Sequence, residues 1–294
     1  MIQPNSLQAW GLAIRPNTLT GAAIPVMIGC ALADMYDKLQ VLPAVLCFLF
    51  AFLMQIDANF INDLFDYLKG SDREDRLGPE RACAQGWITV SAMKAGIAVV
   101  TVLAAITGLS LLFFSGWEMI PVGVACIVFA FLYTAGPYPL AYHGWGDVLV
   151  LVFFGFVPVG CTFYVMAHTW TTPVTVASLA CGLIIDTLLM VNNFRDREQD
   201  AISGKRTLIV RWGARAGLIL YFMLGMVACW CCLYFTSEGK IWAAVLPQLY
   251  LIPHIFTTLK MARINKGKAL NLILGETSRN MLLFGMLLTL GLVL

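Results

Sequence analysis

Charged residues are scarce in this chain. Of its 294 residues only 12% are Asp, Glu, Lys or Arg, 60% are hydrophobic, and the mean hydropathy is +0.80. A soluble globular domain carries about 25% charged residues. The composition therefore excludes an ordinary water-soluble protein and indicates an integral membrane protein with the lipid bilayer as its surroundings. The net charge of +2 says little by itself, and we expect no nucleic-acid partner.

Metal-binding cysteine and histidine patterns are also missing. The nine cysteines are scattered, and the one cluster, Cys229, Cys231 and Cys232, lies in an apolar run without a CxxC pair or a nearby histidine. This argues against a zinc or redox site and favours thiols that face lipid or the core. The N-terminal stretch, MIQPNSLQAWGLAIRPNTLTG, lacks a basic region followed by a small-residue cleavage site, so no cleavable signal peptide is expected.

Long apolar runs, in contrast, are abundant. A helix that crosses a bilayer needs about 20 mainly apolar residues. The sequence predicts nine such segments: 18–34, 41–60, 91–114, 119–135, 147–167, 173–192, 215–236, 241–259 and 277–294. We therefore expect an all-α polytopic membrane protein, with residues 1–294 forming one domain.

The basic residues are distributed unevenly over the loops. With nine spans, all of the 19 lysines and arginines except Lys38 and Lys240 belong to the side that holds the N-terminus. Loops rich in Lys and Arg stay in the cytoplasm. We therefore expect a protein of the cytoplasmic (inner) membrane whose N-terminus and charged loops face the cytoplasm.

Most of the acidic residues gather in two stretches. The first, within 59–81, reads INDLFDYLKGSDREDRLGPER from residue 61 onward, and Asn62 and Asp66 stand one helical turn apart in it. The second, within 192–208, places Asn192, Asp196 and Asp200 at i, i+4 and i+8. This spacing puts the side chains of each stretch along one stripe of a helix.

The two stretches match each other position by position, with the same offset at every match. Asn62 corresponds to Asn192, Asp63 to Asn193, Asp66 to Asp196 and Arg76 to Arg206. The matches suggest an internal duplication, and repeats in membrane proteins commonly place a site at their interface.

Carboxylate and amide oxygens at this spacing are ligands for Mg²⁺ rather than Zn²⁺. Magnesium usually binds one or two carboxylates together with substrate phosphates, and lysine and arginine bind further phosphate oxygens. The two stretches therefore indicate a magnesium–diphosphate site at the membrane surface. A single such stretch could equally be a loop whose charges neutralise one another. The cations expected to bind the diphosphate are Lys69, Arg76, Arg81, Arg195, Lys205 and Arg206.

The stretches NDLFD…KGSD…DRLGPER and NNFRDREQD…GKRTL resemble the two aspartate-rich motifs of the UbiA-type intramembrane prenyltransferases. Further similarity lies in LAIRPNTLTGAAIPVMIGCALA near the start and in YTAGPYPLAYHGWGDVLVLVFFG at 133–155. The finer spelling resembles the branch of menaquinone biosynthesis that acts on 1,4-dihydroxy-2-naphthoate. The resemblance covers about residues 10–213; beyond them only the hydrophobic pattern matches.

The resemblance implies a nine-helix bundle around a central cavity. It also implies Mg²⁺-dependent transfer of a long isoprenyl group from polyprenyl diphosphate to the naphthoate, with loss of CO₂ and diphosphate, to give demethylmenaquinone. Carried over by position, the metal ligands would be Asn62, Asp66, Asp72, Asn192, Asp196 and Asp200. Asp57 and Asp186 lie inside spans and depart from the family pattern, so we expect them to line the cavity or support the residues that do, or else to make polar helix contacts or lie at helix ends.

Six residues are candidates for the chemical step. Asp66, Asp196 and Lys69 belong to the motifs that would stabilise the leaving diphosphate. In the loop after the fourth span, Tyr133 could face the allylic cation, and His143 and Asp147 could position or deprotonate the naphthoate hydroxyl. We expect the remaining charges of the first stretch to do no more than solvate the loop: Asp63, Arg73, Glu74, Asp75 and Glu80.

Three other functions remain open. A prenyltransferase of the same superfamily could use another acceptor, such as hydroxybenzoate, homogentisate or a glycerol phosphate. A cation or organic-anion transporter would also need acids in the membrane, but transporters tend to hold their sites near the midplane, whereas both stretches end at one face. A non-catalytic lipid-binding scaffold gives no reason for two Asn–Asp ladders.

Overall fold

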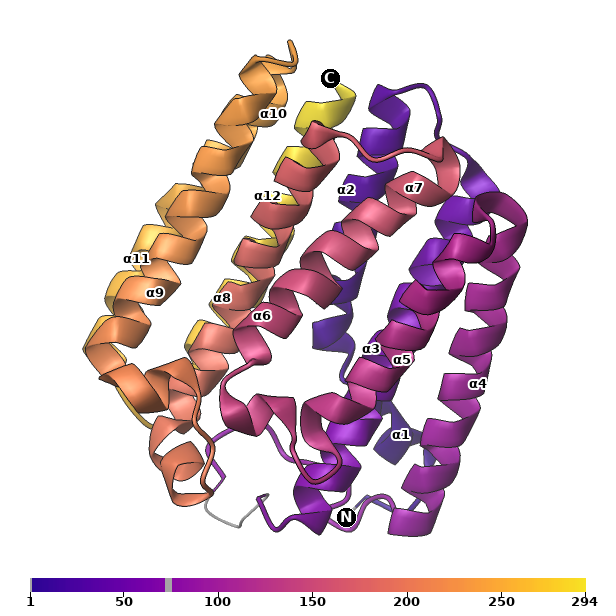
Figure 1. Cartoon of the computed structure of the whole chain (residues 1–294). Coiled ribbons are helices and arrows are strands. Elements are labelled where there is room, and N and C mark those ends of the chain that lie inside the picture. Colours follow the sequence, from indigo (N-terminus) through magenta and orange to yellow (C-terminus); the bar gives the residue numbers. More distant parts are fainter. Residues whose placement is uncertain (1, 72–75) are drawn as a thin grey trace.

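The computed structural model describes residues 2–71 and 76–294, and every regular element within them is helical (Figure 1). The elements form nine segments, as the sequence predicts. In chain order they are α1, η1 and α2 (Leu7–Ile14, Pro16–Thr18, Leu19–Met35); α3 (Val41–Leu68); α4 (Val90–Ser115); η2 and α5 (Trp117–Met119, Ile120–Thr134); α6, η4 and α7 (Gly146–Val150, Leu151–Gly160, Cys161–Ala167); α8 (Thr172–Ile202); α9 and η5 (Leu208–Cys232, Leu233–Thr236); α10, η6 and α11 (Ile241–Val245, Leu246–Tyr250, Leu251–Ile264); and α12 (Leu270–Val293).

Eight of these segments in the described residues are long and apolar enough to cross a membrane. The ninth, α12, has 24 residues but carries Glu276 and Arg279 in its N-terminal half. An all-α membrane bundle of nine helical segments is therefore confirmed. Between the fourth and fifth segments, a short helix η3 (Leu140–His143) lies in the loop.

The helices α3 and α8 are longer than the spans that the sequence predicts. They have 28 and 31 residues, which corresponds to about 42 Å and about 46 Å at a rise of about 1.5 Å per residue. The hydrocarbon core of a bilayer is about 30 Å thick. Both helices continue past the predicted ends at 60 and 192, and the first residues beyond those ends that adopt a left-handed conformation are Gly70 and Gly204. The two acidic stretches therefore stand on helices that project beyond the apolar region.

The helix α8 lies in the interior of the bundle. It packs against α9, η4, α12 and α2, and 67% of its most apolar window is buried, compared with 11% for the segment that holds α5. Its contact with η4 is close at backbone level: a Cβ atom added to Gly155 would lie 2.6 Å from the Ser178 carbonyl oxygen. The second acidic stretch is thus held on the most enclosed helix of the protein.

The N-terminus and the loops that follow α3 and α8 lie at one end of the bundle, and the C-terminus lies at the other (Figure 1). An odd number of crossings requires this arrangement. Near the N-terminus, Arg15 adopts a left-handed conformation (φ 55°) before Pro16 and separates α1 from α2. Trp10 of α1 packs on Phe60 of α3 with ring centroids 5.3 Å apart, so α1 rests against the first motif helix.

Candidate active site

The last turns of α3 carry the first motif. Asn62 and Asp66 line a cavity of about 310 Å³, and Asp66 is only 6% exposed. The Thr134 hydroxyl at the end of α5 donates a hydrogen bond to the Asn62 amide oxygen. The i, i+4 spacing thus aims both oxygen-bearing side chains at the same space, as the sequence predicts.

Asp63 does not line this cavity and has a structural role instead. Its carboxylate accepts hydrogen bonds from the backbone N–H groups of Ala82 and Cys83, both at 2.9 Å, and it pairs with Arg15 at 3.4 Å. It is 1% exposed. The expectation that Asp63 only solvates the loop is therefore wrong. The Asp63 side chain holds the end of that loop against α3 through its hydrogen bonds to Ala82 and Cys83.

The second motif meets the first across the same cavity. Asn192, Asp196 and Asp200 of α8 all line it. The Asn192 amide also donates to the carbonyl of Leu188 in its own helix at 3.1 Å. Two helices whose motifs are far apart in the sequence therefore bring five oxygen-bearing side chains to one space.

Each of the three motif carboxylates Asp66, Asp196 and Asp200 is paired with a cation. Arg81 contacts Asp66 at 3.3 Å, and Lys205 lies 3.5 Å from Asp200. Arg195 makes two short bonds to Asp196, Nε–Oδ1 at 2.7 Å and Nη2–Oδ2 at 2.6 Å. Bidentate pairing of this kind is strong and orients both groups. The site thus places positive and negative groups side by side around its wall.

Tyr142 connects the two motifs. Its hydroxyl lies 3.2 Å from Asp66 Oδ1 and 2.5 Å from Ser71 Oγ. Its ring lies between two ammonium groups, with Lys69 Nζ 4.9 Å and Lys205 Nζ 4.8 Å from the centroid. Burial, and then the negative charge of Asp66, raise the pKa of Tyr142 above its ordinary value. The phenol therefore stays protonated and remains able to donate to Asp66.

The two lysines beside Tyr142 are perturbed in opposite directions. Burial disfavours the charged form of Lys205, but Asp66 and Asp200 outweigh it and raise the pKa of Lys205. For Lys69, which is largely exposed, the partial desolvation of the ammonium group outweighs the attraction of Asp66 and, together with the positive charge of Lys205, lowers the pKa. Lys69 also donates to the Thr134 carbonyl at 2.5 Å. Lys205 is thus the more firmly charged of the two.

Most of the predicted site residues converge. Those that line the polar cavity are Asn62, Asp66, Arg76, Arg81, Tyr133, Asp147, Asn192, Arg195, Asp196, Asp200 and Lys205.

Three predicted residues stand apart. Lys69 is exposed, with its ammonium group over the Tyr142 ring. Arg206 is exposed and donates its backbone N–H to the Tyr142 carbonyl at 2.8 Å. The ring of His143 stacks on Tyr138, with centroids 3.5 Å apart, and its Nδ1 lies 2.9 Å from the Pro139 carbonyl. None of these three lines the cavity. Asp72 lies outside the described residues.

The two acids within the spans also lie away from the cavity wall. Asp57 accepts a hydrogen bond from Thr101 of α4 at 2.8 Å, and Asp186 is buried on α8. Neither lines this polar cavity or the apolar cavity described next. A cavity-lining role is therefore not found, and the alternative of a polar helix contact holds for Asp57.

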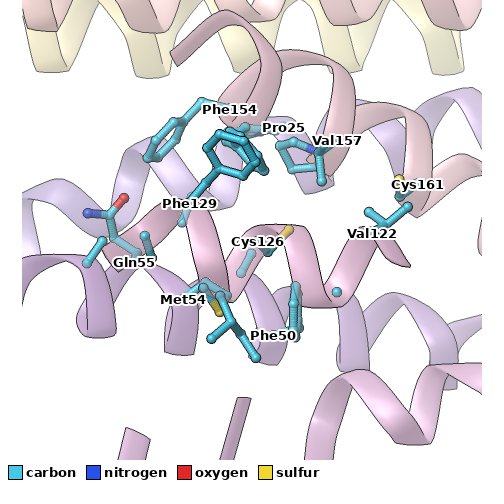
Figure 2. A pocket seen from close by; sticks show the side chains of 18 of the residues that line it. Pro25, Phe50, Met54, Gln55, Val122, Cys126, Phe129, Phe154, Val157 and Cys161 are labelled. Carbon is cyan, nitrogen blue, oxygen red and sulfur yellow. The ribbon is translucent and has the colours of Figure 1, made fainter. Parts of the chain in front are cut away.

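An apolar cavity of about 490 Å³ continues from the polar one, with which it shares Asn62, Asn192 and Tyr133. Along α3 its wall follows one stripe from Asn62 through Ala58, Met54 and Phe50 to Cys47. That length of helix corresponds to about 22 Å at a rise of about 1.5 Å per residue. Figure 2 shows the close-up: Phe129, Phe154, Met54 and Cys126 surround the space, and Gln55 supplies an amide. A cavity of this shape accepts a long apolar chain whose head lies in the polar cavity.

Comparison with known proteins agrees with this geometry. The model of the UbiA prenyltransferase family matches residues 22–289. The chain belongs to the UbiA prenyltransferase family. Such a match covers nearly the whole bundle, including both motif helices and the C-terminal segments that the sequence resemblance does not reach.

Individual UbiA relatives share most of the chain. The 1,4-dihydroxy-2-naphthoate octaprenyltransferase of Haemophilus influenzae is 35% identical, over 98% of this chain and 96% of its own length. The protein of the same name from Escherichia coli is 38% identical, over 72% and 70%. A UbiA homologue from Archaeoglobus fulgidus, solved with GPP and Mg²⁺, has a TM-score of 0.71 at 15% identity, with 97% of this chain and 99% of that chain covered.

The donor set around the polar cavity fits a magnesium ion. In the described residues, no group of three or more His, Cys, Asp or Glu side chains converges as a ready metal site. Asp66, Asp196 and the amides Asn62 and Asn192 nevertheless face one space. Magnesium needs only one or two carboxylates when substrate phosphates and water complete its shell. The fit thus depends on a phosphate-bearing substrate.

Sequence reasoning missed two residues of this region. Arg15 lines the polar cavity, and it belongs to the LAIRPNTLTG stretch whose similarity to the family was the only signal. Asn271 of α12 accepts a bond from Arg195 at 2.8 Å and donates to the Leu77 carbonyl at 2.8 Å. Asn271 therefore ties the second motif to the loop of the first. Nothing in its local sequence distinguishes it.

Proposed function

We propose that this protein transfers a long isoprenyl group from polyprenyl diphosphate to 1,4-dihydroxy-2-naphthoate in a Mg²⁺-dependent reaction. Diphosphate and CO₂ leave, and the immediate product is demethylmenaquinol, the reduced form of demethylmenaquinone. The observation that carries the proposal is the junction of two cavities: a polar one with two Asn–Asp ladders and paired cations, and an apolar one continuous with it. The naphthoate relatives, similar over most of the chain, support the choice of acceptor.

The polar cavity would hold the diphosphate head. Asn62, Asp66, Asn192, Asp196 and Asp200, together with Asp72, would provide the ligands of Mg²⁺, directly or through water. When bound, the metal would neutralise negative charge that develops on the departing diphosphate. Around the metal, we assign phosphate contacts to six cations: Lys69, Arg76, Arg81, Arg195, Lys205 and Arg206. Of these, Lys69 and Arg206 do not line the polar cavity.

The existing ion pairs balance the charges of the site before the substrate binds. Arg81, Arg195 and Lys205 now neutralise Asp66, Asp196 and Asp200. A diphosphate offers these cations stronger partners, so they can turn to it while the carboxylates turn to the metal. Fixed positive groups aimed at the leaving oxygen favour the transition state over the ground state, because the charge grows there.

The apolar cavity would hold the isoprenyl chain and keep water away from the reacting carbon. An allylic cation survives only where water is excluded, and aromatic faces stabilise it. Tyr133 lies where both cavities meet, so its ring can face that carbon. We place the aromatic acceptor beside it. The protein acts as a single membrane domain of the cytoplasmic (inner) membrane, with the motif loops on the cytoplasmic side.

A prenylation assay tests this function. Protein in membranes or nanodiscs is supplied with Mg²⁺, farnesyl or longer diphosphates, and a panel of acceptors: the naphthoate, hydroxybenzoate, homogentisate and glycerol phosphate. We expect a prenylated naphthoate product and CO₂, both lost when EDTA removes the metal. Folded protein that prenylates another acceptor instead would overturn the choice of substrate. Folded protein that prenylates none would overturn the enzyme assignment.

A further inference from the structure

Two carboxyl groups on neighbouring helical segments each have a buried oxygen without a hydrogen-bond partner among the described residues. The two atoms are Oδ1 of Asp147 on α6 and Oδ1 of Asp186 on α8. Asp186 is 5% exposed. A buried polar atom without a partner destabilises the fold, so two such atoms close together invite a functional explanation.

Packing places the two acids in the same layer of the bundle. A Cβ atom added to Gly146 would lie 3.3 Å from Leu189, and one added to Gly182 would lie 2.7 Å from Leu151. The two segments therefore run antiparallel in contact, with residues 147–150 opposite 183–188. Asp186 accordingly interacts electrostatically with Asp147.

The pair adjoins the place where head and chain of the donor would meet. Asp147 lines the polar cavity, whereas Asp186 lines neither cavity and so stands behind it. Tyr133, which lines both cavities, interacts electrostatically with Asp147 and Asp186. His143, the other candidate base, is turned toward Tyr138 and the Pro139 carbonyl.

We propose that the Asp147–Asp186 pair takes the hydroxyl proton of the aromatic acceptor while the new carbon–carbon bond forms, and returns it after CO₂ has left. Asp147 faces the acceptor, and Asp186 is a positioning residue. Two neighbouring carboxyl groups with buried oxygens favour holding one proton between them, since both cannot remain charged at low cost. This inference rests on the proposed prenyl transfer and adds the site of its proton.

The step balances without any further reactant. The carbon–oxygen bond of the donor breaks, and its electron pair leaves with the diphosphate. The hydroxyl proton moves to the pair, the O–H electrons form a ketone, and the ring carbon that bears the carboxylate bonds to the prenyl carbon. The resulting β-keto carboxylate loses CO₂, the electrons return to the ring oxygen, and the oxygen takes the proton back. No net proton is consumed.

Variants of the pair test the inference against a matched control. Asp57 is also buried, also has one oxygen without a hydrogen-bond partner, and stands apart from both cavities. We expect Asp147→Asn to lower kcat with the naphthoate about 10²-fold and Asp186→Asn to lower it about 10-fold or more, while Asp57→Asn leaves it within about twofold. The KM for prenyl diphosphate and the unfolding temperature should hold in all three, and Asp186→Glu should restore part of the rate.

Two further measurements sharpen the test, and the second needs only wild type and Asp147→Asn, so it decides the question even if Asp186→Asn does not accumulate. The double variant should be no slower than Asp147→Asn alone, because residues that act as a unit are not additive. An acceptor methylated on the hydroxyl beside the attacked carbon has no proton to give, so wild type and Asp147→Asn should prenylate it at the same low rate.

Several results would overturn the pair. The first is an Asp186→Asn rate equal to that of Asp57→Asn. The second is a double variant in which the losses of the two single variants multiply. The third is a methylated acceptor that Asp147→Asn prenylates more slowly than wild type does. In each case wild-type turnover on the naphthoate leaves the proposed function standing. A wild type that prenylates no acceptor removes both.

Discussion

The two motif helices have similar sequences, but their matching side chains make different contacts. On α3, Asp63 binds the backbone N–H groups of Ala82 and Cys83, and Asp66 takes its cation, Arg81, from beyond the end of the helix. On α8, Asp196 pairs with the adjacent Arg195, and the position that matches Asp63 is Asn193, which lines the cavity. Matched positions thus provide similar oxygens to the cavity, while the loop beyond each helix is held by its own means.

The same divergence affects the basic residues. Arg76 lines the polar cavity, whereas Arg206, its match in the second stretch, contributes a backbone bond to Tyr142 and leaves its side chain exposed. Symmetry in the sequence therefore predicts the oxygen ladders well and the phosphate-binding cations less well. The internal duplication itself stays a prediction.

The largest effect is expected where the two helices are alike. Asp66→Asn and Asp196→Asn each remove a carboxylate from the shared cavity, and each should lower kcat by at least about 10²-fold. Glu198→Gln is the control, since Glu198 is an exposed acid on α8 outside the cavity wall. Steady-state kinetics in nanodiscs measures this. Equal losses support two equivalent halves, and a variant that keeps its rate would remove that helix from the site.

Next in size is the difference between Asp63 and Asn193. Asp63→Ala leaves two buried N–H groups without their acceptor and breaks the pair with Arg15, so the free energy of unfolding should fall by about 2–5 kcal/mol. Asn193→Ala should cost less than about 1 kcal/mol. Thermal or denaturant unfolding of the purified protein in detergent compares them. Similar losses for both variants would contradict the structural task assigned to Asp63.

Substitution of the two lysines around Tyr142 should affect substrate binding to different extents, with the larger effect at the lysine whose pKa is raised. Lys205→Met removes the more firmly charged group and should raise the KM for prenyl diphosphate about 10-fold or more, whereas Lys69→Met should change it less. The raised pKa means that the stability gained from Lys205 is complete below its ordinary value, about 10.5, and is lost only as pH rises through the higher folded value. Kinetics and unfolding between about pH 6 and about pH 9 should therefore show no loss from Lys205. A loss in that range would contradict the shift.

The smallest rate change is expected at Tyr142, which connects the two motifs. Tyr142→Phe removes the hydroxyl bonds to Asp66 and Ser71 but keeps the ring between the two ammonium groups. A rate loss of about fivefold is expected, because one hydrogen bond contributes about 0.5–1.5 kcal/mol. The matched Tyr138→Phe change, at an exposed tyrosine of the same loop, should be neutral. If both variants behave alike, Tyr142 does not connect the motifs.

The sequence predicts the fold well, since bilayer thickness and backbone hydrogen bonding leave few alternatives to apolar helices. Nine segments and the oxygen ladders at i and i+4 follow directly from it. The ends of α3 and α8 do not, because polar residues that continue a helix beyond the lipid look like loop in a hydropathy profile. Only the glycines at 70 and 204 mark where these helices stop.

Contacts between distant segments are the part that sequence reasoning could not supply. Asn271 reaches Arg195 and Leu77 across 76 and 194 residues, and the Asp147–Asp186 layer exists because glycines let α8 and the α6–η4 segment approach. His143 looked as suitable as Asp147 in the sequence, yet its ring is engaged within its own loop. Such choices depend on packing rather than on motif spelling.

The central claim is that α3 and α8 together build one magnesium–diphosphate site. Binding of a non-reactive prenyl thiodiphosphate to wild type, Asp66→Asn and Asp196→Asn, measured by calorimetry with and without Mg²⁺, tests it most directly. We expect one molecule bound per chain, only with Mg²⁺, and binding strongly weakened by either substitution alone. Mg²⁺-independent binding, or binding that survives the loss of one helix's carboxylate unchanged, would contradict a shared site.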